Sequence, residues 1–204
     1  MSRDVPADHP DRVRWNGRYA GGPAPSFTPH PLAVRALALD LPDGPVADLA
    51  CGPSGGVLLA AAQGRRVEAV DVSDIALGML GEQARLHGLD HLITRVHADL
   101  SAWRPAPRTY ALIVCTLFWD AAVFSVAADA VTDGGLLGWE ALTPEARRVR
   151  PGLPSQWLLA PGEPASLLPA GFTVLDQHDL APHEGIARRQ MLARRGITGG
   201  APTR

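Results

Sequence analysis

The chain has 204 residues, of which 46% are hydrophobic, so its length and composition suit one domain with a sizeable core. Its 19 basic and 21 acidic residues give a net charge of −2, which predicts neither a nucleic acid nor an anionic membrane as partner. Every basic residue in that count is an arginine. The absence of lysine excludes phosphate-loop nucleotide hydrolysis and Schiff-base chemistry, because both need a lysine amine.

Cysteine usage and the N-terminal sequence indicate a reduced compartment. Two cysteines are too few for a disulfide framework or a cysteine-built zinc site, and the scattered histidines predict no metal site either. The polar start M-S-R-D-V-P-A-D-H-P is unlike a signal peptide, and no run approaches the roughly 18 apolar residues of a membrane span. We expect a soluble, cytoplasmic protein, and the Arg, Ala, Gly and Pro bias favours a bacterial source.

Helical and strand patterns alternate along most of the chain, as in a doubly wound α/β protein. The predicted elements are, in order, a helix over 31–41, a strand over 45–50, a helix over 55–63, a strand over 66–70, a helix over 73–87, strands over 91–97 and 110–116, a helix over 120–130, and a strand over 135–142. This alternation predicts a mostly parallel sheet with helices on both faces.

The last third of the chain changes character. Residues 144–164 are rich in proline and are predicted to form an insertion or lid, and residues 171–179 and 186–195 are predicted to be two closing strands. No internal repeat or linker divides the chain. We therefore predict a flexible arm over 1–12, one domain over 13–196, and a flexible tail over 197–204. Nothing in the sequence indicates an oligomeric state.

The most informative stretch is V-A-D-L-A-C-G-P-S-G-G, a strand that breaks into a glycine-rich loop. Such a loop lets backbone N–H groups and a helix N-terminus approach a ligand closely. The next strand ends in Asp71, and a carboxylate there can accept the hydroxyl hydrogens of a ribose. The G-x-G-x-x-G pattern of dinucleotide binding is absent, and the acid Asp48 precedes the loop. A carboxylate at that point favours a ligand with an ammonium group over a pyrophosphate.

These residues resemble class I S-adenosylmethionine-dependent methyltransferases. D-L-A-C-G-P-S-G looks like the family's first motif, with Ser54 in place of its third glycine. The resemblance continues in order through A-V-D-V-S, V-H-A-D-L, Y-A-L-I-V-C-T-L-F and D-G-G-L-L-G-W-E. R-W-N-G-R-Y resembles an element of the small-molecule group that includes the tellurite-resistance and thiopurine-like enzymes. The resemblance implies a Rossmann-like fold with a seven-stranded sheet and S-adenosylmethionine as cofactor, with S-adenosylhomocysteine as product.

The resemblance also implies roles for single residues. Asp71 would bind the ribose, Asp99 the exocyclic amine of adenine, and Asp48 the ammonium group, while Arg18 and Tyr19 would close over the methionine carboxylate. The remaining cofactor-binding positions that it implies are Ala50, Gly52, Val72, Leu100 and Cys115.

Each of these residues also has a structural interpretation. Asp71 is an acid near a helix N-terminus, where the helix dipole favours it, and Asp99 can cap a turn. Arg18 can be a solvated side chain of a loose arm. Cys51 and Cys115 are expected to meet where the first and fourth strands end, and we favour small core residues over thiol chemistry for this pair.

Aromatic residues that follow the fourth strand indicate the acceptor side. Phe118 and Trp119 lie where the methyl group should emerge, and with Glu140 they make up the predicted substrate pocket. Methyl transfer from a sulfonium is an in-line displacement, to which a protein contributes mainly alignment and exclusion of water. Glu140, Asp120 and His30 are possible bases, none of them compelling, so no catalytic residue is assigned. A soft anionic acceptor needs no base.

The sequence thus favours a methyltransferase acting on a small molecule, with neither a nucleic acid nor a membrane as partner. The alternative is a catalytically silent methyltransferase-like protein that binds the cofactor or acts as a sensor. An oxidoreductase on a similar sheet is disfavoured by the missing dinucleotide motif.

Overall fold

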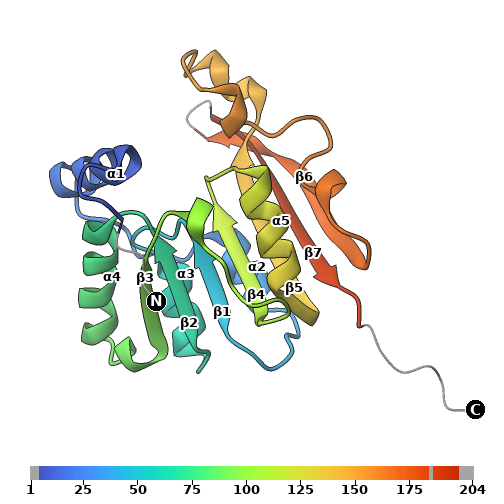
Figure 1. Ribbon diagram of the computed structural model, residues 1–204, viewed down its shortest axis with the longest axis horizontal. Helices are drawn as coiled ribbons and strands as arrows, with labels where there is room; N and C mark the ends of the chain where they lie inside the picture. Colours follow the sequence, from blue (N-terminus) through green and yellow to red (C-terminus); the bar gives the residue numbers. More distant parts are fainter. Residues whose placement is uncertain (1–4, 184–185, 198–204) are drawn as a thin grey trace, which may run out of the picture.

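The structure is a computed structural model that describes residues 5–183 and 186–197. A seven-stranded sheet with the strand order β3-β2-β1-β4-β5-β7-β6 runs through its centre (Figure 1). The strands are β1 (Val46–Leu49), β2 (Val67–Asp71), β3 (Ile93–His97), β4 (Tyr110–Thr116), β5 (Val131–Leu142), β6 (Phe172–His183) and β7 (Ile186–Arg195). The two closing strands expected from the sequence are both present.

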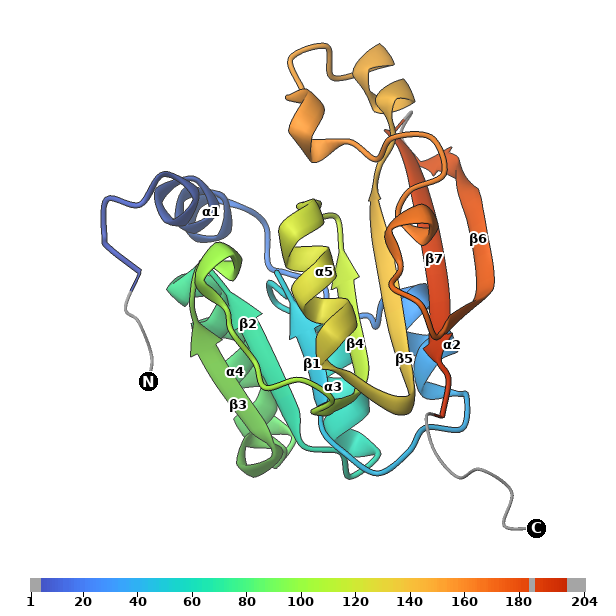
Figure 2. The same cartoon turned by 45° about the vertical axis from the view of Figure 1, so that its right-hand side comes forward.

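Helices cover both faces of the sheet, as the alternating pattern predicts. The helices are α1 (Pro10–Gly21), α2 (Pro31–Leu37), α3 (Gly55–Ala62), α4 (Asp74–Leu86) and α5 (Ala121–Ala130). One apolar cluster joins α2, α3 and α4 to one face of the sheet, and a second joins α5 to the other face (Figures 1 and 2). Within the described ranges, no helix is long and apolar enough to cross a membrane.

The sheet is mixed, and the expectation of a mostly parallel sheet is corrected here. Strands β1 to β5 pair in parallel, whereas β7 pairs antiparallel with both β5 and β6. The expectation came from the alternation of strands and helices, and this alternation ends at β5. Among the described residues after β5, no α-helix lies between strands, and β6 is followed in the chain by β7, an order that favours antiparallel pairing.

The central strands form because their sequences are continuous apolar runs. All four residues of β1 and the first six of β4 are buried, as expected for strands that are covered on both faces. Helix α3 consists mostly of small residues. Its first residue, Gly55, has no space for a side chain because the backbone of the segment before α2 packs against it. A Cβ at position 55 would overlap the carbonyl oxygen of Phe27 and would lie 2.7 Å from the backbone nitrogen of Pro29. The segment before α2 therefore rests directly on the glycine-rich loop.

Two segments project above the carboxyl ends of the parallel strands. Helix α1 crosses this edge, and the stretch between β5 and β6 rises beyond it (Figure 2). That stretch contains only the short 3₁₀ helices η3 (Pro144–Arg148), η4 (Ser155–Trp157) and η5 (Ala165–Leu167). Helix α1 was not predicted from the sequence, and it begins inside the expected arm over 1–12. Residues 1–4 and 198–204 lie outside the described residues.

Candidate functional site

The site is built where β1 and β2 end, around the carboxylate of Asp71. Its Oδ2 accepts a hydrogen bond from the Gly52 N–H at 2.7 Å, and its Oδ1 accepts one from the Ser73 N–H at 2.7 Å. The side chain is buried, and burial raises its pKa while the two backbone donors lower it. Asp71 thus ties the glycine-rich loop to the start of α4. Each oxygen keeps a lone pair that could accept a ribose hydroxyl.

The backbone of the loop adopts left-handed conformations just after β1. Ala50 has φ of +49° and Gly52 has φ of +56°. Glycine fits this conformation without strain, whereas alanine adopts it at a cost. A Cβ at position 52 would lie 2.7 Å from the hydroxyl of Tyr19, so α1 lies against the loop at this glycine. Burial and the nearby Asp71 raise the pKa of Tyr19 to about 12, which keeps the phenol neutral.

Ser54, the departure from the family's first motif, has a structural role. Its hydroxyl donates a hydrogen bond to Oδ2 of Asp48 at 2.6 Å and accepts one from the Val57 N–H at 3.2 Å. Ser54 is thus the N-cap of α3, a position that serine favours. The serine therefore holds the buried acid of β1 and starts the helix.

Asp48 is a buried acid whose pKa is raised by its surroundings. It is 7% exposed, and burial raises its pKa to about 7 against the opposing hydrogen bond from Ser54. The nearby His30 lowers the pKa of Asp48, and Asp71 raises it. A buried carboxylate near neutrality is stabilised in its charged form by an ammonium group placed beside it.

This raised pKa predicts pH-dependent cofactor binding. If the cofactor's ammonium group binds ionised Asp48, a proton competes with it, so affinity should fall below pH 7 by up to about tenfold per pH unit. Calorimetric titration of S-adenosylhomocysteine at pH 5.5, 6.5 and 7.5 measures this dependence. The Asp48→Asn variant should bind weakly at all three values, and an identical pH dependence in that variant would contradict the assignment.

Asp99 has the capping contact that its structural interpretation predicts. Its Oδ1 accepts a hydrogen bond from the Ser101 N–H at 2.8 Å, at the start of η2 (Leu100–Ala102). Its Oδ2 lies 3.3 Å from Nε2 of His9. Leu100 is buried next to it, in the core cluster that includes Val70. The adenine role of Asp99 stays a prediction, and no sequence motif indicated His9 as its neighbour.

None of the residues of α1 is buried, and polar side chains attach this helix to the site. Asn16 accepts a hydrogen bond from the Ser73 hydroxyl at 2.6 Å and donates one to Asp74 at 2.8 Å. Arg12 donates to the same Asp74 oxygen at 2.9 Å, and the pKa of Asp74 falls to about 2 because of these two donors. These contacts join α1 to the residues that follow Asp71. Sequence reasoning missed Asn16, although it lies within the quoted motif R-W-N-G-R-Y.

The predicted acceptor side is aromatic and mostly core. Trp119 packs edge-on against Trp139 with ring centroids 6.2 Å apart, and Phe124 completes this group. The indole N–H of Trp139 donates to the carbonyl of Phe118 at 2.9 Å, which fixes the turn after β4. Of the three predicted pocket residues, Trp119 and Glu140 are buried and Phe118 is half-buried, so Phe118 is the most accessible.

The thiols beside these aromatics are poor nucleophiles. Cys115 is fully buried at the end of β4, and Cys51 is half-buried in the glycine-rich loop. Burial raises the pKa of both thiols, and the nearby carboxylates of Asp48 and Asp71 raise it further. Both groups are therefore neutral near pH 7, which fits the interpretation as small core residues.

Each of the three possible bases is already bound by the protein. Glu140 is fully buried and accepts hydrogen bonds from Gln190 at 2.7 Å and Arg188 at 3.0 Å. His30 caps α2 through Nδ1, so its other nitrogen carries the hydrogen and faces Glu140 at 3.4 Å. Asp120 caps α5 by accepting from two backbone N–H groups. Of the three, Asp120 is exposed, and only its Oδ1 accepts the two capping hydrogen bonds. Among the residues that the structure describes, no cluster of three or more His, Cys, Asp or Glu side chains could hold a metal ion.

Solved structures share this arrangement of elements. The cyclase SpnF matches with a TM-score of 0.70 and 13% identity, over 96% of this chain and 98% of its own. A methyltransferase from Mesorhizobium loti dependent on S-adenosylmethionine matches with a TM-score of 0.63 and 18% identity, over 80% of this chain and 96% of its own. The fold is that of the methyltransferases.

A third structure was solved with the cofactor product bound. It is geranyl diphosphate C-methyltransferase from Streptomyces coelicolor A3(2) in complex with S-adenosylhomocysteine, with a TM-score of 0.63 and 16% identity over 80% of this chain and 73% of its own. No protein-family model matches the chain, and no curated protein matches its sequence. At these low sequence identities, the structural similarity establishes the fold alone.

Proposed function

We propose that this protein is a methyltransferase that uses S-adenosylmethionine and acts on a small molecule. The observation that carries the proposal is the placement of Asp71, whose two oxygens bind the Gly52 and Ser73 N–H groups at 2.7 Å where β1 and β2 end. Asp48 lies buried close to it, with its pKa near neutrality. One carboxylate suits a ribose and the other an ammonium group, and S-adenosylmethionine contains both.

The residues of the site would bind and orient the cofactor. Asp71 would accept the ribose hydroxyls, Asp48 would bind the ammonium group, and the N–H groups after β1 would face the ligand. Tyr19 and Arg18 on α1 would cover the methionine carboxylate. Bound S-adenosylmethionine supplies an electrophilic methyl group on a sulfonium. Alignment and exclusion of water by α1 and the aromatic residues after β4 are then the protein's main contribution.

The hydrogen bonds that already hold Glu140 and His30 favour an acceptor that needs no strong base. An atom that is already anionic, or a soft nucleophile, attacks the methyl group without prior loss of a proton. This agrees with the resemblance to the tellurite-resistance and thiopurine-like group, which we retain as a proposal on the basis of R-W-N-G-R-Y on α1. Two of the similar structures are a geranyl diphosphate C-methyltransferase and a phosphoethanolamine N-methyltransferase, and we do not transfer these substrates to this protein.

Binding and turnover test the proposal in sequence. Calorimetry should give a dissociation constant for S-adenosylhomocysteine in the micromolar range, and incubation with labelled S-adenosylmethionine and a panel of thiols, oxyanions and phenols should transfer label. Absence of cofactor binding at millimolar concentration would refute the proposal.

A second candidate is a protein of this fold that binds the cofactor without transferring its methyl group. It is favoured by the match to SpnF, which covers nearly the full length of both chains and is named as a cyclase. It is also favoured by the hydrogen bonds that already hold Glu140 and His30. This candidate predicts cofactor binding at the same residues and no label transfer to any member of the acceptor panel.

A further inference from the structure

We infer that the small molecule accepted at this site carries a phosphate or carboxylate group, and that Arg14 on α1 binds it. The inference rests on the proposed function, because it concerns the acceptor side of the same site. It is carried by a series of stacked aromatic and guanidinium groups that links α1 to the insertion over 144–164. We call this series, formed by Trp157, Arg14, Trp15 and Arg18, the stacked ladder.

The ladder alternates cations and rings. The guanidinium carbon of Arg14 lies 4.9 Å from the ring centroid of Trp157 and 5.5 Å from that of Trp15. The guanidinium of Arg18 lies 5.6 Å from the Trp15 ring, and the Trp15 ring stacks on Tyr19 at 6.0 Å. Trp157 belongs to the insertion, and the other three ladder residues belong to α1. The ladder therefore spans the two segments that project above the strand ends.

The position of Trp157 places this end of the ladder beside β5. The next residue, Leu158, bridges to Leu142 at the end of that strand, and the Leu159 N–H donates to the Leu142 carbonyl at 2.9 Å. Strand β5 is next to β4, after which Phe118 and Trp119 follow, whereas Asp71 lies at the end of β2 on the other side of β1. Arg14 thus reaches toward the acceptor side, and Arg18 stays closer to Tyr19 and the cofactor loop.

Stacking leaves the hydrogen-bonding edge of a guanidinium unused. A ring contacts the flat face of the group, while its N–H donors lie in the plane and form a fork that matches a carboxylate or phosphate. Within residues 5–183 and 186–197, neither Arg14 nor Arg18 donates a hydrogen bond or forms an ion pair. By contrast, Arg12 on the same helix binds Asp74, and Arg147 in the insertion binds the Leu153 carbonyl. If Arg18 covers the methionine carboxylate, Arg14 is the arginine of α1 that remains for the acceptor.

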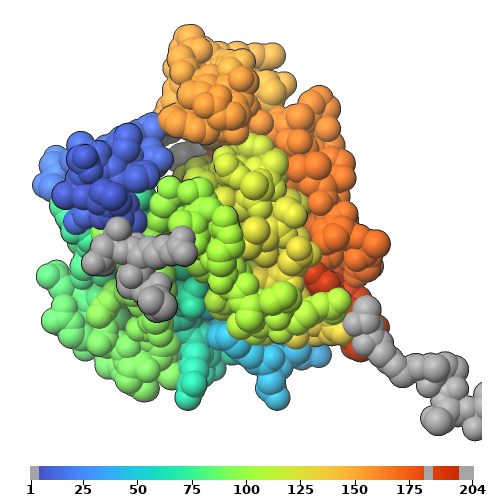
Figure 3. All heavy atoms as spheres, viewed as in Figure 1, coloured from blue at the N-terminus to red at the C-terminus, as the bar shows by residue number. Residues whose placement is uncertain are grey.

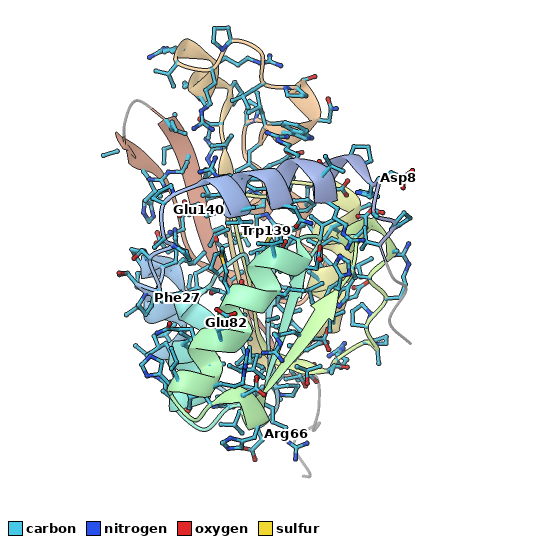
Figure 4. All side chains as sticks on the ribbon, turned by 90° about the vertical axis from the view of Figure 1, so that its left-hand side faces the viewer. Asp8, Phe27, Arg66, Glu82, Trp139 and Glu140 are labelled. Atoms are coloured by element: carbon cyan, nitrogen blue, oxygen red, sulfur yellow. The ribbon has the colours of Figure 1, made fainter. Side chains whose placement is uncertain are left out.

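The charge of the rim is opposite to that of the whole chain. Helix α1 and the insertion together hold six of the 19 arginines and three of the 21 acidic residues, in a protein with net charge −2. Figure 3 shows a hollow between α1 and the insertion. In the side view, α1 passes above the labelled Trp139 and Glu140 (Figure 4). A hollow with a positive rim concentrates anions from solution.

Matched pairs of probes test the inference with the full-length protein saturated with S-adenosylhomocysteine. Phenyl phosphate is compared with phenol, and benzoate with benzyl alcohol, by calorimetry and by tryptophan fluorescence. At least one charged probe should bind ten or more times more tightly than its neutral partner, and this preference should shrink as salt rises from 50 to 500 mM. The pair that shows the preference identifies the anion as phosphate or carboxylate.

Variants then assign the preference to Arg14. Arg14→Gln should reduce it at least fivefold and leave the affinity for S-adenosylhomocysteine within twofold of the original. Arg66→Gln removes the same charge from the opposite end of the molecule (Figure 4) and should change neither quantity. Trp157→Leu, checked for folding by thermal unfolding, should weaken binding of the charged probe because it removes the ring that positions the guanidinium.

Two results would overturn the inference: equal affinity for charged and neutral probes, or an unchanged preference in Arg14→Gln. The proposed function fails separately, if the cofactor product does not bind. The probe titration is therefore repeated without S-adenosylhomocysteine, so that an anion site without a cofactor site is distinguished from the reverse.

Discussion

Replacing Asp71 with alanine should lower the affinity for S-adenosylhomocysteine about 100-fold, equivalent to about 3 kcal/mol. The carboxylate is the expected partner of the ribose hydroxyls, and hydrogen bonds to a charged group are among the stronger ones in proteins. It also holds the Gly52 and Ser73 N–H groups, both at 2.7 Å. The substitution therefore removes a ligand contact and loosens the loop that should surround the ligand. Calorimetric titration measures the loss.

Two further variants separate binding from folding. Asp71→Asn keeps an oxygen for one backbone donor but turns its NH2 group toward the other, so it should lose less affinity than Asp71→Ala while thermal stability falls modestly. Asp90→Ala removes an exposed acid that pairs with Arg95 just before β3, at the opposite end of the strands, and should bind the cofactor product normally. Undiminished binding by Asp71→Ala would remove the main support for the cofactor assignment.

The sequence predicts the sheet up to β5 well because these strands are encoded locally. Continuous apolar runs mark β1 and β4, and each acid at a strand end marks the same edge of the sheet. Strand β5 begins at Val131, four residues earlier than expected. The D-G-G stretch, which suggests a turn, lies inside this strand and interrupts its regular pairing. Gly134 there has φ of +75°, and the pairing with β4 shifts register between Tyr110 and Leu112. A local turn signal was thus overridden by strand pairing.

Helix α1 was not predicted for the opposite reason: the residues that contact it lie far away in the sequence. It has no buried residues, so it lacks the apolar stripe by which a helix is recognised. Its contacts join Asn16 to Ser73 and Arg14 to Trp157, and no local pattern reports such pairs. The local signals that could have found it are Pro10 in its first turn and the spacing of Trp15 and Tyr19 by four residues.

The candidate site likewise contains positions that motifs predict and contacts that they do not. The positions of Asp48 and Asp71 follow from the motifs, because both acids belong to strands whose register is fixed by burial. The hydrogen bonds from Gln190 and Arg188 to Glu140 do not follow from any motif. Gln190 is 50 residues away in the chain, and it meets Glu140 only because β7 pairs antiparallel with β5. No local pattern therefore predicts that Glu140 is held by residues of β7.

Gly55 gives the largest expected effect on stability. Gly55→Ala should lower the free energy of unfolding by about 2–4 kcal/mol, because the new Cβ would overlap the Phe27 carbonyl and lie 2.7 Å from the Pro29 nitrogen. Both are backbone atoms, which cannot swing aside as a flexible side chain can. For a chain of this size the loss corresponds to a fall in melting temperature of about 5–15 °C. Thermal unfolding measures it directly.

The same substitution at Gly78 provides the matched control. Gly78 lies inside α4, is exposed, and has no atom within 4 Å of an added Cβ, so alanine there should raise stability by about 0.5–1 kcal/mol. Opposite signs for one chemical change would show that contact with the segment before α2, rather than helix propensity, constrains Gly55. That segment continues into His30, which caps α2 and faces Glu140, so a shift of the Phe27–Pro29 backbone should also disturb the polar contacts beside Asp48. Weaker cofactor binding by any folded Gly55→Ala protein is the expected consequence, and unchanged binding and stability in this variant would contradict the close approach.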